Sequence, residues 1–158
     1  MEEVIGGFDG EEEVGWVQRY NTITGACVEV AGMLTSRFGH SACFLDGYIY
    51  TVGGRTYMSL VIGDDEALAT VERYDIANDR WDVVKPMNKR REGAGISVIS
   101  GRIYVLGGSE WTTPDDTIEC YDPADDTWKI VGNLPTSRAY LTAVPFTLWK
   151  GLGRSMEN

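Results

Sequence analysis

The fold of this chain is decided by the stretch VERYDIANDRWDVVKPM (residues 71–87), which returns as TIECYDPADDTWKIVGNL (residues 117–134). In both stretches a tyrosine is followed seven residues later by a tryptophan. Upstream of each lies an apolar run that ends in two glycines, YIYTVGG (residues 48–54) and GRIYVLGG (residues 101–108). A combination of this kind that recurs with a period of about 50 residues predicts a repeat protein made of similar units.

A weaker third copy lies in the first forty or so residues. There Gly6-Gly7 and Tyr20 keep the pattern, but Cys27 stands where the other two copies have tryptophan. Ten residues after each of these positions comes an arginine: Arg37, Arg91 or Arg138. We expect structural roles for the other recurring residues, which are Gly6, Gly7, Tyr20, Gly53, Gly54, Tyr74, Trp81, Gly107, Gly108, Tyr121 and Trp128.

Each full copy predicts four short strands. Runs of apolar, β-branched and small residues are bounded by glycine, proline, asparagine and aspartate, as strands usually are. Asp46-Gly47 and Ser100-Gly101 are typical of two-residue hairpin turns, because glycine accepts a positive φ. The expected strands cover residues 4–5, 16–20 and 26–30, then 38–45, 48–52, 69–75 and 81–84, then 94–99, 103–106, 117–121 and 128–131.

The copies divide the chain into units. We expect a repeat region over residues 1–146, comprising a partial unit (1–36), two full units (37–90 and 91–137) and the first strand of a further unit (138–146). An irregular tail should follow over residues 147–158. The second unit has seven extra residues, all within 55–68, where a loop tolerates insertion. A tyrosine and a tryptophan across a short hairpin can share one apolar layer between neighbouring units.

These phrases resemble the kelch repeats of the BTB–kelch family, from about residue 4 to residue 146. The resemblance implies an all-β fold, a partial kelch β-propeller of about three four-stranded antiparallel blades. In that family the propeller recognises a partner protein, whereas the BTB and BACK regions dimerise and bind a cullin-3 ubiquitin ligase. The resemblance covers neither of those regions. Cys27, the incomplete fourth copy and a blade number below the family's usual number of about six are departures from the pattern.

The resemblance implies a non-enzymatic protein-binding module, the substrate-recognition segment of a cullin-3 ubiquitin-ligase adaptor that binds a peptide or degron. An actin-binding cytoskeletal scaffold is the alternative function. Three blades are too few for a closed ring, so the chain either belongs to a larger propeller or associates with itself. In the second case, residues 139–146 of each copy would complete the partial first unit of the other.

Composition excludes several classes of partner. The formal net charge of −10 argues against binding nucleic acid, which depends on clustered lysine and arginine. No apolar run approaches the roughly 18 residues of a membrane span, and the acidic start Met1-Glu2-Glu3 lacks the positive region of a signal peptide. Three cysteines without CxxC spacing indicate reduced thiols, so we expect a cytoplasmic or nuclear protein.

The candidate binding residues follow the double glycines and the unit boundaries. They are Arg37, Arg55, Tyr57, Arg91, Ser109, Trp111 and Arg138. Arginine, tyrosine and tryptophan are frequent interface anchors. Arg37, Arg91 and Arg138 could form a positive ring for an acidic peptide or tie the loops between units to carboxylates such as Glu72 and Glu119, and their recurrence in every unit favours the structural role.

The same loops are acidic. They carry Asp9, Glu11, Glu12, Glu13, Asp64, Asp65, Glu66, Glu110, Asp115 and Asp116. These side chains either select a basic partner or only keep the protein soluble.

No motif predicts catalysis. His40 is the only histidine, and a zinc or copper site needs several ligands at recognisable spacing. No nucleophile–base pair and no glycine-rich phosphate loop before a helix is apparent. We therefore expect no catalytic residue, no metal and no cofactor.

Overall fold

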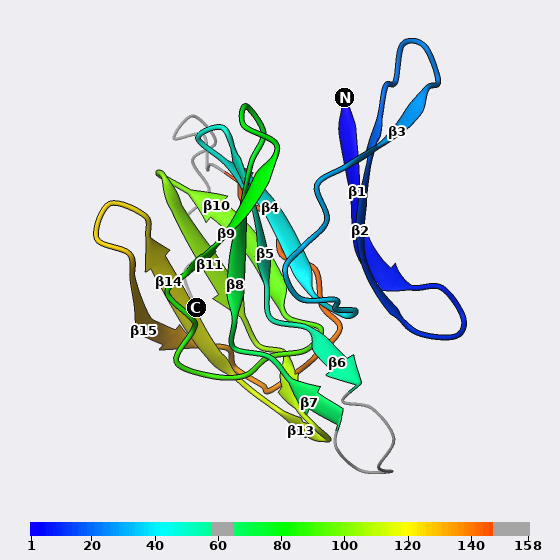
Figure 1. Cartoon of the computed structure of the whole chain (residues 1–158). Helices are drawn as coiled ribbons and strands as arrows, with labels where there is room; N and C mark the ends of the chain where they lie inside the picture. The colour runs from blue at the N-terminus through cyan, green and yellow to red at the C-terminus, as the bar shows by residue number, and fades with distance from the viewer. Residues whose placement is uncertain (58–64, 147–158) are drawn as a thin grey trace.

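The computed structural model describes residues 1–57 and 65–146, and the tail predicted over residues 147–158 lies outside them. In the described residues the chain forms fifteen β-strands and no helix, so the all-β expectation is confirmed. No helix in this part of the chain could cross a membrane. The strands form three sheets of three or four strands, which we call blades, and two short hairpins (Figure 1).

Blade 2 is a four-stranded antiparallel sheet. Its strands, in spatial order, are β4 (Ser41–Leu45), β5 (Tyr48–Val52), β8 (Val71–Asp75) and β9 (Arg80–Val84). Asp46 and Gly47 join the first two strands with φ angles of 50° and 87°, as a two-residue turn with two positive φ angles requires. The predicted strands of this unit are thus present, but the first begins three residues later than expected.

Blade 3 repeats this topology. Its strands are β10 (Gly95–Ile99), β11 (Arg102–Leu106), β14 (Thr117–Asp122) and β15 (Thr127–Asn133), in that spatial order. Ser100 and Gly101 make the equivalent turn, with φ angles of 51° and 73°. The pairing of β14 with β15 shifts register between Ile118 and Glu119, so the two blades differ by one bulge.

Blade 1 has three strands. They are β1 (Glu2–Phe8), β2 (Glu13–Tyr20) and β3 (Cys27–Val30), in the order β1-β2-β3. Aligned on the double glycines, these strands correspond to the second, third and fourth strands of the other blades. This sheet stands at one side of the two four-stranded sheets, drawn in blue in Figure 1.

Two hairpins that the sequence did not predict extend the full blades. β6 (Arg55–Tyr57) pairs with β7 (Asp65–Ala67), and β12 (Ser109–Glu110) pairs with β13 (Thr113–Pro114). Both follow a double glycine and lie at the end of the sheets drawn at the bottom of Figure 1, as does the turn between β1 and β2. The segment of residues 55–68, which holds the seven extra residues, therefore has strand pairing at its two ends.

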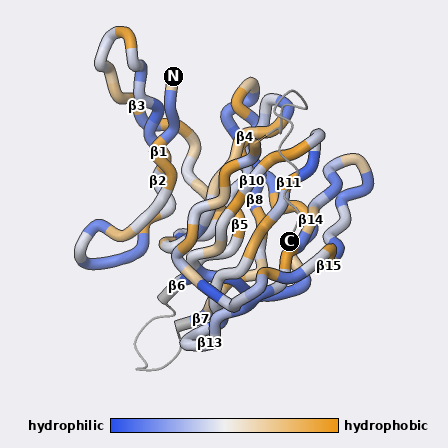
Figure 2. Tube along the Cα trace, turned by 180° about the vertical axis from the view of Figure 1, so that it is seen from behind, coloured by the Kyte–Doolittle hydropathy of each residue, from blue (hydrophilic) through white to orange (hydrophobic). Residues whose placement is uncertain are grey.

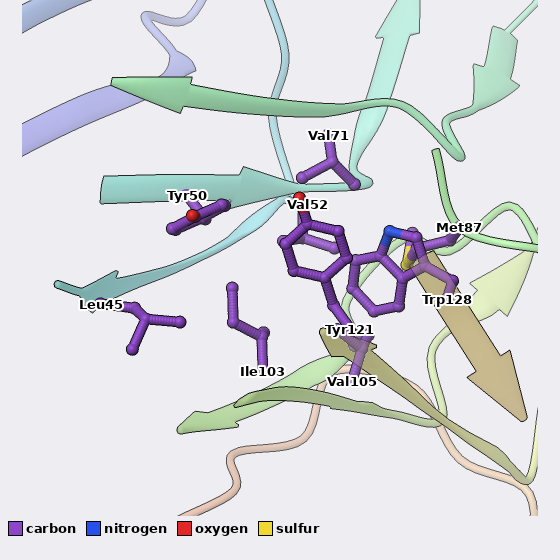
Figure 3. Packing of buried hydrophobic residues seen from close by; sticks show 10 residues of the cluster. Leu45, Tyr50, Val52, Val71, Met87, Ile103, Val105, Tyr121 and Trp128 are labelled. Atoms are coloured by element: carbon purple, nitrogen blue, oxygen red, sulfur yellow. The ribbon is translucent and has the colours of Figure 1, made fainter. Parts of the chain in front are cut away.

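The core lies between blades, because each blade buries one face against the next. Blades 2 and 3 enclose the cluster drawn in Figure 3, in which the tyrosine–tryptophan pair of blade 3 packs on Tyr50, Val52 and Met87 of blade 2. Blades 1 and 2 enclose a second cluster in which Tyr74 and Trp81 contact blade 1 residues. Along the trace, apolar residues concentrate in the strands of blades 2 and 3 (Figure 2).

The tyrosine–tryptophan pairs do what their spacing predicts. The ring centroids are 5.1 Å apart for Tyr74 and Trp81 and 5.0 Å apart for Tyr121 and Trp128. Each indole Nε1 donates to a backbone carbonyl just after the last strand of the preceding blade. Trp81 donates to Ala31 (2.7 Å) and Trp128 donates to Lys85 (2.8 Å). The pair of one blade therefore fastens that blade to the blade before it.

One predicted strand is absent. Residues 139–140 form a bend and residues 141–146 have no regular secondary structure, where we expected the first strand of a further blade over residues 138–146. A strand needs a neighbour for its hydrogen bonds, and no described strand pairs with this segment. Leu141 and Ala143 instead lie against Gly95 of β10.

Candidate functional site

Arg91 joins blade 2 to blade 3. Its Nη2 lies 3.0 Å from Oε1 of Glu119 and 2.5 Å from Oγ1 of Thr117, and its Nη1 donates to the carbonyl of Gly107. Arg91 and Glu119 are both fully buried. A buried pair of this kind is tolerated only when its remaining donors and acceptors are also satisfied, and here they are.

Arg37 makes the same contacts one blade earlier. Its Nη2 lies 2.5 Å from Oε1 of Glu72, and its Nη1 donates to the carbonyls of Gly53 (2.9 Å) and Thr70 (3.1 Å). Burial lowers the pKa of the Arg37 guanidinium, and the charge of Glu72 opposes this shift. Arg37 and Arg91 have no exposed surface for a partner, so the structure gives them the structural role that recurrence favoured.

Arg138 holds the third copy of this position and differs from the other two. It is exposed, and its Nη2 donates only to Oγ1 of Thr136 at 2.8 Å among the side chains described. The partners of Arg37 and Arg91 come from the third strand of the following blade, and no blade follows Arg138 in the described residues. Its guanidinium therefore remains available for an interaction.

Arg55 and Ser109 are occupied by contacts between blades. Nε of Arg55 forms an ion pair with Oε2 of Glu92 at 3.2 Å, without hydrogen-bond alignment. Glu92 is buried and also accepts a hydrogen bond from the Tyr140 hydroxyl at 2.6 Å. Ser109 is buried and pairs with Glu92 through backbone hydrogen bonds. Glu92 was missed from the sequence, although it breaks the repeat by standing where the preceding unit has Phe38.

Trp111 is a half-exposed aromatic residue at the loop end of blade 3. It occupies the turn between β12 and β13 with a φ of 57°, and 48% of it is exposed. A shallow depression of about 490 Å³ lies beside it, lined by Glu110, Trp111, Thr113, Pro114 and Asp115. Tyr57, the other predicted aromatic, is placed only by its backbone as the last residue of β6.

We call this end of the molecule the loop face; it comprises the turn of residues 9–12, the hairpins β6–β7 and β12–β13, and residues 89–90 and 115–116. Ion pairs tie its parts together. Nζ of Lys89 lies 2.6 Å from Oδ2 of Asp115. Nη1 of Arg90 forms an ion pair with Oε1 of Glu66, and Nε of Arg90 lies 4.0 Å from Oε1 of Glu110. Blade 1 joins through Glu13, which accepts a hydrogen bond from Thr56 at 2.8 Å.

The loop face keeps an acidic surplus. The described carboxylates Asp9, Glu11, Glu12 and Asp116 take part in no described ion pair. Backbone N–H groups of Glu12 and Glu11 donate to Asp9 and lower the pKa of its carboxyl. Asp64 lies outside the described residues, and Asp65 is placed only by its backbone. The surplus is therefore greatest at the turn of residues 9–12.

Asp115 is the most strongly perturbed carboxylate of the loop face. Burial alone would raise the pKa of its carboxyl, but hydrogen bonds from Lys89 and Thr117 and the charge of Arg91 outweigh it and lower the pKa to about 2. The carboxylate therefore stays ionised and holds Lys89 in place. In the described residues, no group of three or more histidine, cysteine and acidic side chains could hold a metal ion.

Comparison with known proteins agrees with the repeats seen in the structure. The Kelch motif family matches residues 36–88 and 90–135, which are the full blades 2 and 3 with their entering segments. The match begins after the three-stranded blade 1 and includes none of its strands.

Several curated proteins are similar over most of the chain. Kelch-like protein 25 of Xenopus tropicalis is 30% identical over 146 residues, which cover 89% of this chain and 24% of that protein. Kelch-like protein 23 of Pongo abelii is 32% identical and covers 85% of this chain and 23% of its own length. Kelch-like protein 21 of Danio rerio is 33% identical and covers 84% of this chain. The chain spans about a quarter of the length of the first two relatives.

Proposed function

Because the chain belongs to the kelch-repeat family and is similar to the Kelch-like proteins, we propose that it binds a protein partner through the loop face. A kelch repeat region is typically a non-catalytic binding module. The observation that carries the proposal is that some of the predicted site residues are buried between blades and others are exposed on the loop face. Arg37, Arg91 and Ser109 are buried between blades, whereas Trp111 and Glu110 lie in the β12–β13 hairpin with about half of each side chain exposed.

The chemistry of the loop face favours a basic segment as the partner. A half-exposed tryptophan beside carboxylates can hold a lysine or arginine by cation–π and ionic contacts together. The described carboxylates without ion pairs add a longer-range attraction, which increases association rates and falls with salt. We therefore propose that the partner presents lysine or arginine next to an extended segment.

The binding experiment compares variants of the whole chain. Partners are captured from a cell lysate with the wild type and with the double variant Glu110→Lys, Trp111→Ala. We expect the double variant to bind its main partner at least about tenfold more weakly, because an anchor is lost and a charge is reversed. Ile23→Ala is the control, since Ile23 is exposed in the turn between β2 and β3, away from the loop face. Equal capture by both variants would contradict the proposed surface.

Arg55 is less suitable for this test. Its removal would leave Glu92 buried without its ion-pair partner, so the variant would lose stability as well as any contact. A loss of binding by Arg55→Ala would therefore not separate recognition from folding.

We further propose that the partner is a ubiquitylation substrate and that the chain represents the recognition segment of a cullin-3 adaptor. An excess of this chain in cells should occupy the substrate without recruiting the ligase, so the substrate should accumulate. The Glu110→Lys, Trp111→Ala variant should not cause accumulation. If the captured partners are degraded at their normal rate, the result contradicts the adaptor role but leaves the proposed binding intact.

We also propose that the protein resides in a reducing compartment, the cytosol or the nucleus. Cys27, Cys43 and Cys120 are all free thiols in the structure, which suits such a compartment. A fluorescent fusion of the chain would test it, and secretion of the fusion would argue against it.

A further inference from the structure

The edge of β1 that faces away from β2 is open. In blades 2 and 3 the corresponding edge pairs with the first strand of the sheet, β4 or β10, which we call the innermost strand. In blade 2 the equivalent strand, β5, pairs along this edge with β4, from Ser41 opposite Val52 to Leu45 opposite Tyr48. When the blades are aligned on Gly6 and Gly53, Ile5 takes the place of Val52. Among the described residues no strand pairs with this edge of β1. An open strand edge is a template for another strand.

A cavity of about 540 Å³ adjoins this edge, between blade 1 and blade 2. Its lining is mostly apolar and includes Ile5, Phe44 and Ile49. At the equivalent place between blades 2 and 3, Leu45 of the innermost strand is buried in the core and Cys43 packs against it. The cavity is therefore the space that two side chains of an innermost strand would fill.

Residues 138–146 have the features of an innermost strand without a neighbour. Tyr140 has a φ of 54°, close to the values of 61° and 60° at Gly39 and Gly93, which stand at the same distance after Arg37 and Arg91. Its N–H donates to the carbonyl of Gly93 at 2.6 Å, as the N–H of Gly93 donates to that of Gly39 at 2.8 Å. Counted from the arginines, Val144 matches Cys43 and Phe146 matches Leu45.

Val144 and Phe146 are exposed to 75% and 81%. Two large apolar side chains therefore stand in water at the positions that are packed in blade 2. The apolar outer face of blade 3, with Leu106, Ile118 and Val131 beside this segment, is also partly open.

We propose that residues 142–146 of one copy pair with β1 of a second copy, with Thr142 opposite Ile5 and Phe146 opposite Met1. Val144 and Phe146 then fill the cavity between blades 1 and 2 of that second copy. The same exchange in the other direction closes two chains into a ring of six blades, a number within the usual range of about four to eight. Each copy contributes a strand to the open edge of β1 in the other copy.

Pro145 is compatible with this pairing. It matches Phe44, which stands next to the pair that flanks the two-residue turn of blade 2. Pairs alternate between hydrogen-bonded and non-hydrogen-bonded, and the pair that flanks such a turn is hydrogen-bonded. The residue at the Phe44 position therefore has an N–H that faces away from its neighbour, and proline is tolerated at that place on an edge strand.

Arg138 also gains partners in the ring. The acceptors of Arg37 are the carbonyls of Gly53 and Thr70 and the carboxylate of Glu72. Their counterparts in blade 1 are the carbonyls of Gly6 and Trp16 and the side-chain oxygen of Gln18. These acceptors are uncharged, so the contact is weaker than the buried ion pairs within one chain, as suits an association between copies.

Light scattering on the purified whole chain, coupled to gel filtration over a series of dilutions, tests this proposal. We expect twice the mass of one chain for the wild type and a shift to the single-chain mass for Phe146→Asp and Val144→Asp, with at least about a hundredfold weaker association. Val83→Asp is the control and should remain a dimer, because Val83 is exposed on β9, away from the proposed junction.

Hydrogen exchange locates the contact. Because β1 gains a neighbour only in the dimer, the amides of Glu3 and Ile5 should exchange more slowly in the wild type than in Phe146→Asp. A wild type that stays monomeric at about 100 µM, a dimer that survives both aspartate variants, or equal exchange at β1 would each overturn the proposal. The loop-face variant Glu110→Lys, Trp111→Ala should dimerise normally, so this test is separate from that of partner binding.

Discussion

Arg91 and Arg138 stand at the same position of successive repeats, yet one is fully buried and the other is exposed. Arg91 reaches forward to Glu119, Thr117 and Gly107 of the next blade, whereas Arg138 has only Thr136 of its own segment. The same contrast separates Tyr121, which packs between blades 2 and 3, from Tyr20, which lies on the outer face of blade 1 with 38% exposed. A repeat residue therefore acquires its role from the neighbouring blade.

The contrast has a direction. Arginines reach forward to the following blade, and tyrosine–tryptophan pairs reach back to the preceding one. The face of blade 3 that has no following blade therefore leaves an arginine exposed, Arg138. The face of blade 1 that has no preceding blade leaves a tyrosine exposed, Tyr20.

The largest effect is expected for Arg91→Ala. The variant leaves Glu119 buried without its cation, which costs about 3–5 kcal/mol in the free energy of unfolding. Arg138→Ala is the matched control and, at a dilution where single chains prevail, should change that free energy by less than about 0.5 kcal/mol, because the side chain is exposed in the single chain. Urea unfolding followed by tryptophan fluorescence measures both. Equal losses in the two variants would mean that burial does not distinguish these arginines.

The second comparison is between Gly53→Ala and Gly7→Ala. Both glycines have a positive φ, of 63° and 119°, but a Cβ at Gly53 would overlap the carbonyl oxygen of Arg91, whereas nothing lies within 4 Å at Gly7. Backbone strain applies to both, and overlap with rigid backbone applies to one. We expect a loss of about 3 kcal/mol at Gly53 and about 1 kcal/mol at Gly7, measured by the same unfolding assay. A larger loss at Gly7 would contradict this account.

The third comparison concerns pH and His40. Burial, followed by the charge of Arg37, lowers the pKa of His40 to about 4. The folded state therefore favours neutral His40, and this stability is complete above pH 6.5 and is lost as the pH falls toward 4. In blade 3 the same position is Ala94. His40→Ala therefore removes the titrating imidazole and leaves a residue that this position already holds in the next blade.

We expect the wild type to lose about 2 kcal/mol more than His40→Ala between pH 7 and pH 4.5. Unfolding free energies of both proteins at the two pH values give this difference directly. Parallel losses would show that His40 titrates as it does in an unfolded chain.

The smallest effect is expected at the tyrosine hydroxyls. The Tyr121 hydroxyl donates to Oδ1 of Asp126 at 2.8 Å, so Tyr121→Phe should cost about 1 kcal/mol. Tyr20→Phe should change stability by about 0.3 kcal/mol or less, since water can reach its ring on the outer face of blade 1. Thermal melts of the two variants provide the measurement. In a closed dimer Tyr20 would lie at a junction, so a clear loss for Tyr20→Phe at high concentration would support the ring.

Much of the fold could be read from the sequence because its signals are local. Alternating apolar residues and the turns at Asp46-Gly47 and Ser100-Gly101 located the strands of the full blades to within a few residues. The hairpins β6–β7 and β12–β13 were missed, since their strands are two or three residues long and carry no alternation. The strand over residues 139–146 was wrong because a strand requires a partner as well as a pattern.

The site was less predictable than the fold. Recurrence favoured a structural role for all three arginines but could not show which of them are buried, because burial depends on whether a following blade supplies a carboxylate such as Glu72 or Glu119. Glu92, which holds Arg55 and Tyr140, was missed because its importance comes from residues far away in the sequence. Trp111, one of the predicted anchors, is 48% exposed in the turn between β12 and β13, and its role in binding stays a prediction.

The sequence by itself determined the repeating unit, its strands and turns, and the residues that join one unit to the next, because each of these depends on spacing within a single blade. Only the tertiary structure decided which copies of those joining residues are buried and which are exposed. The reason is physical: burial and pairing of a side chain depend on the atoms opposite it, and in this fold those atoms belong to a different blade.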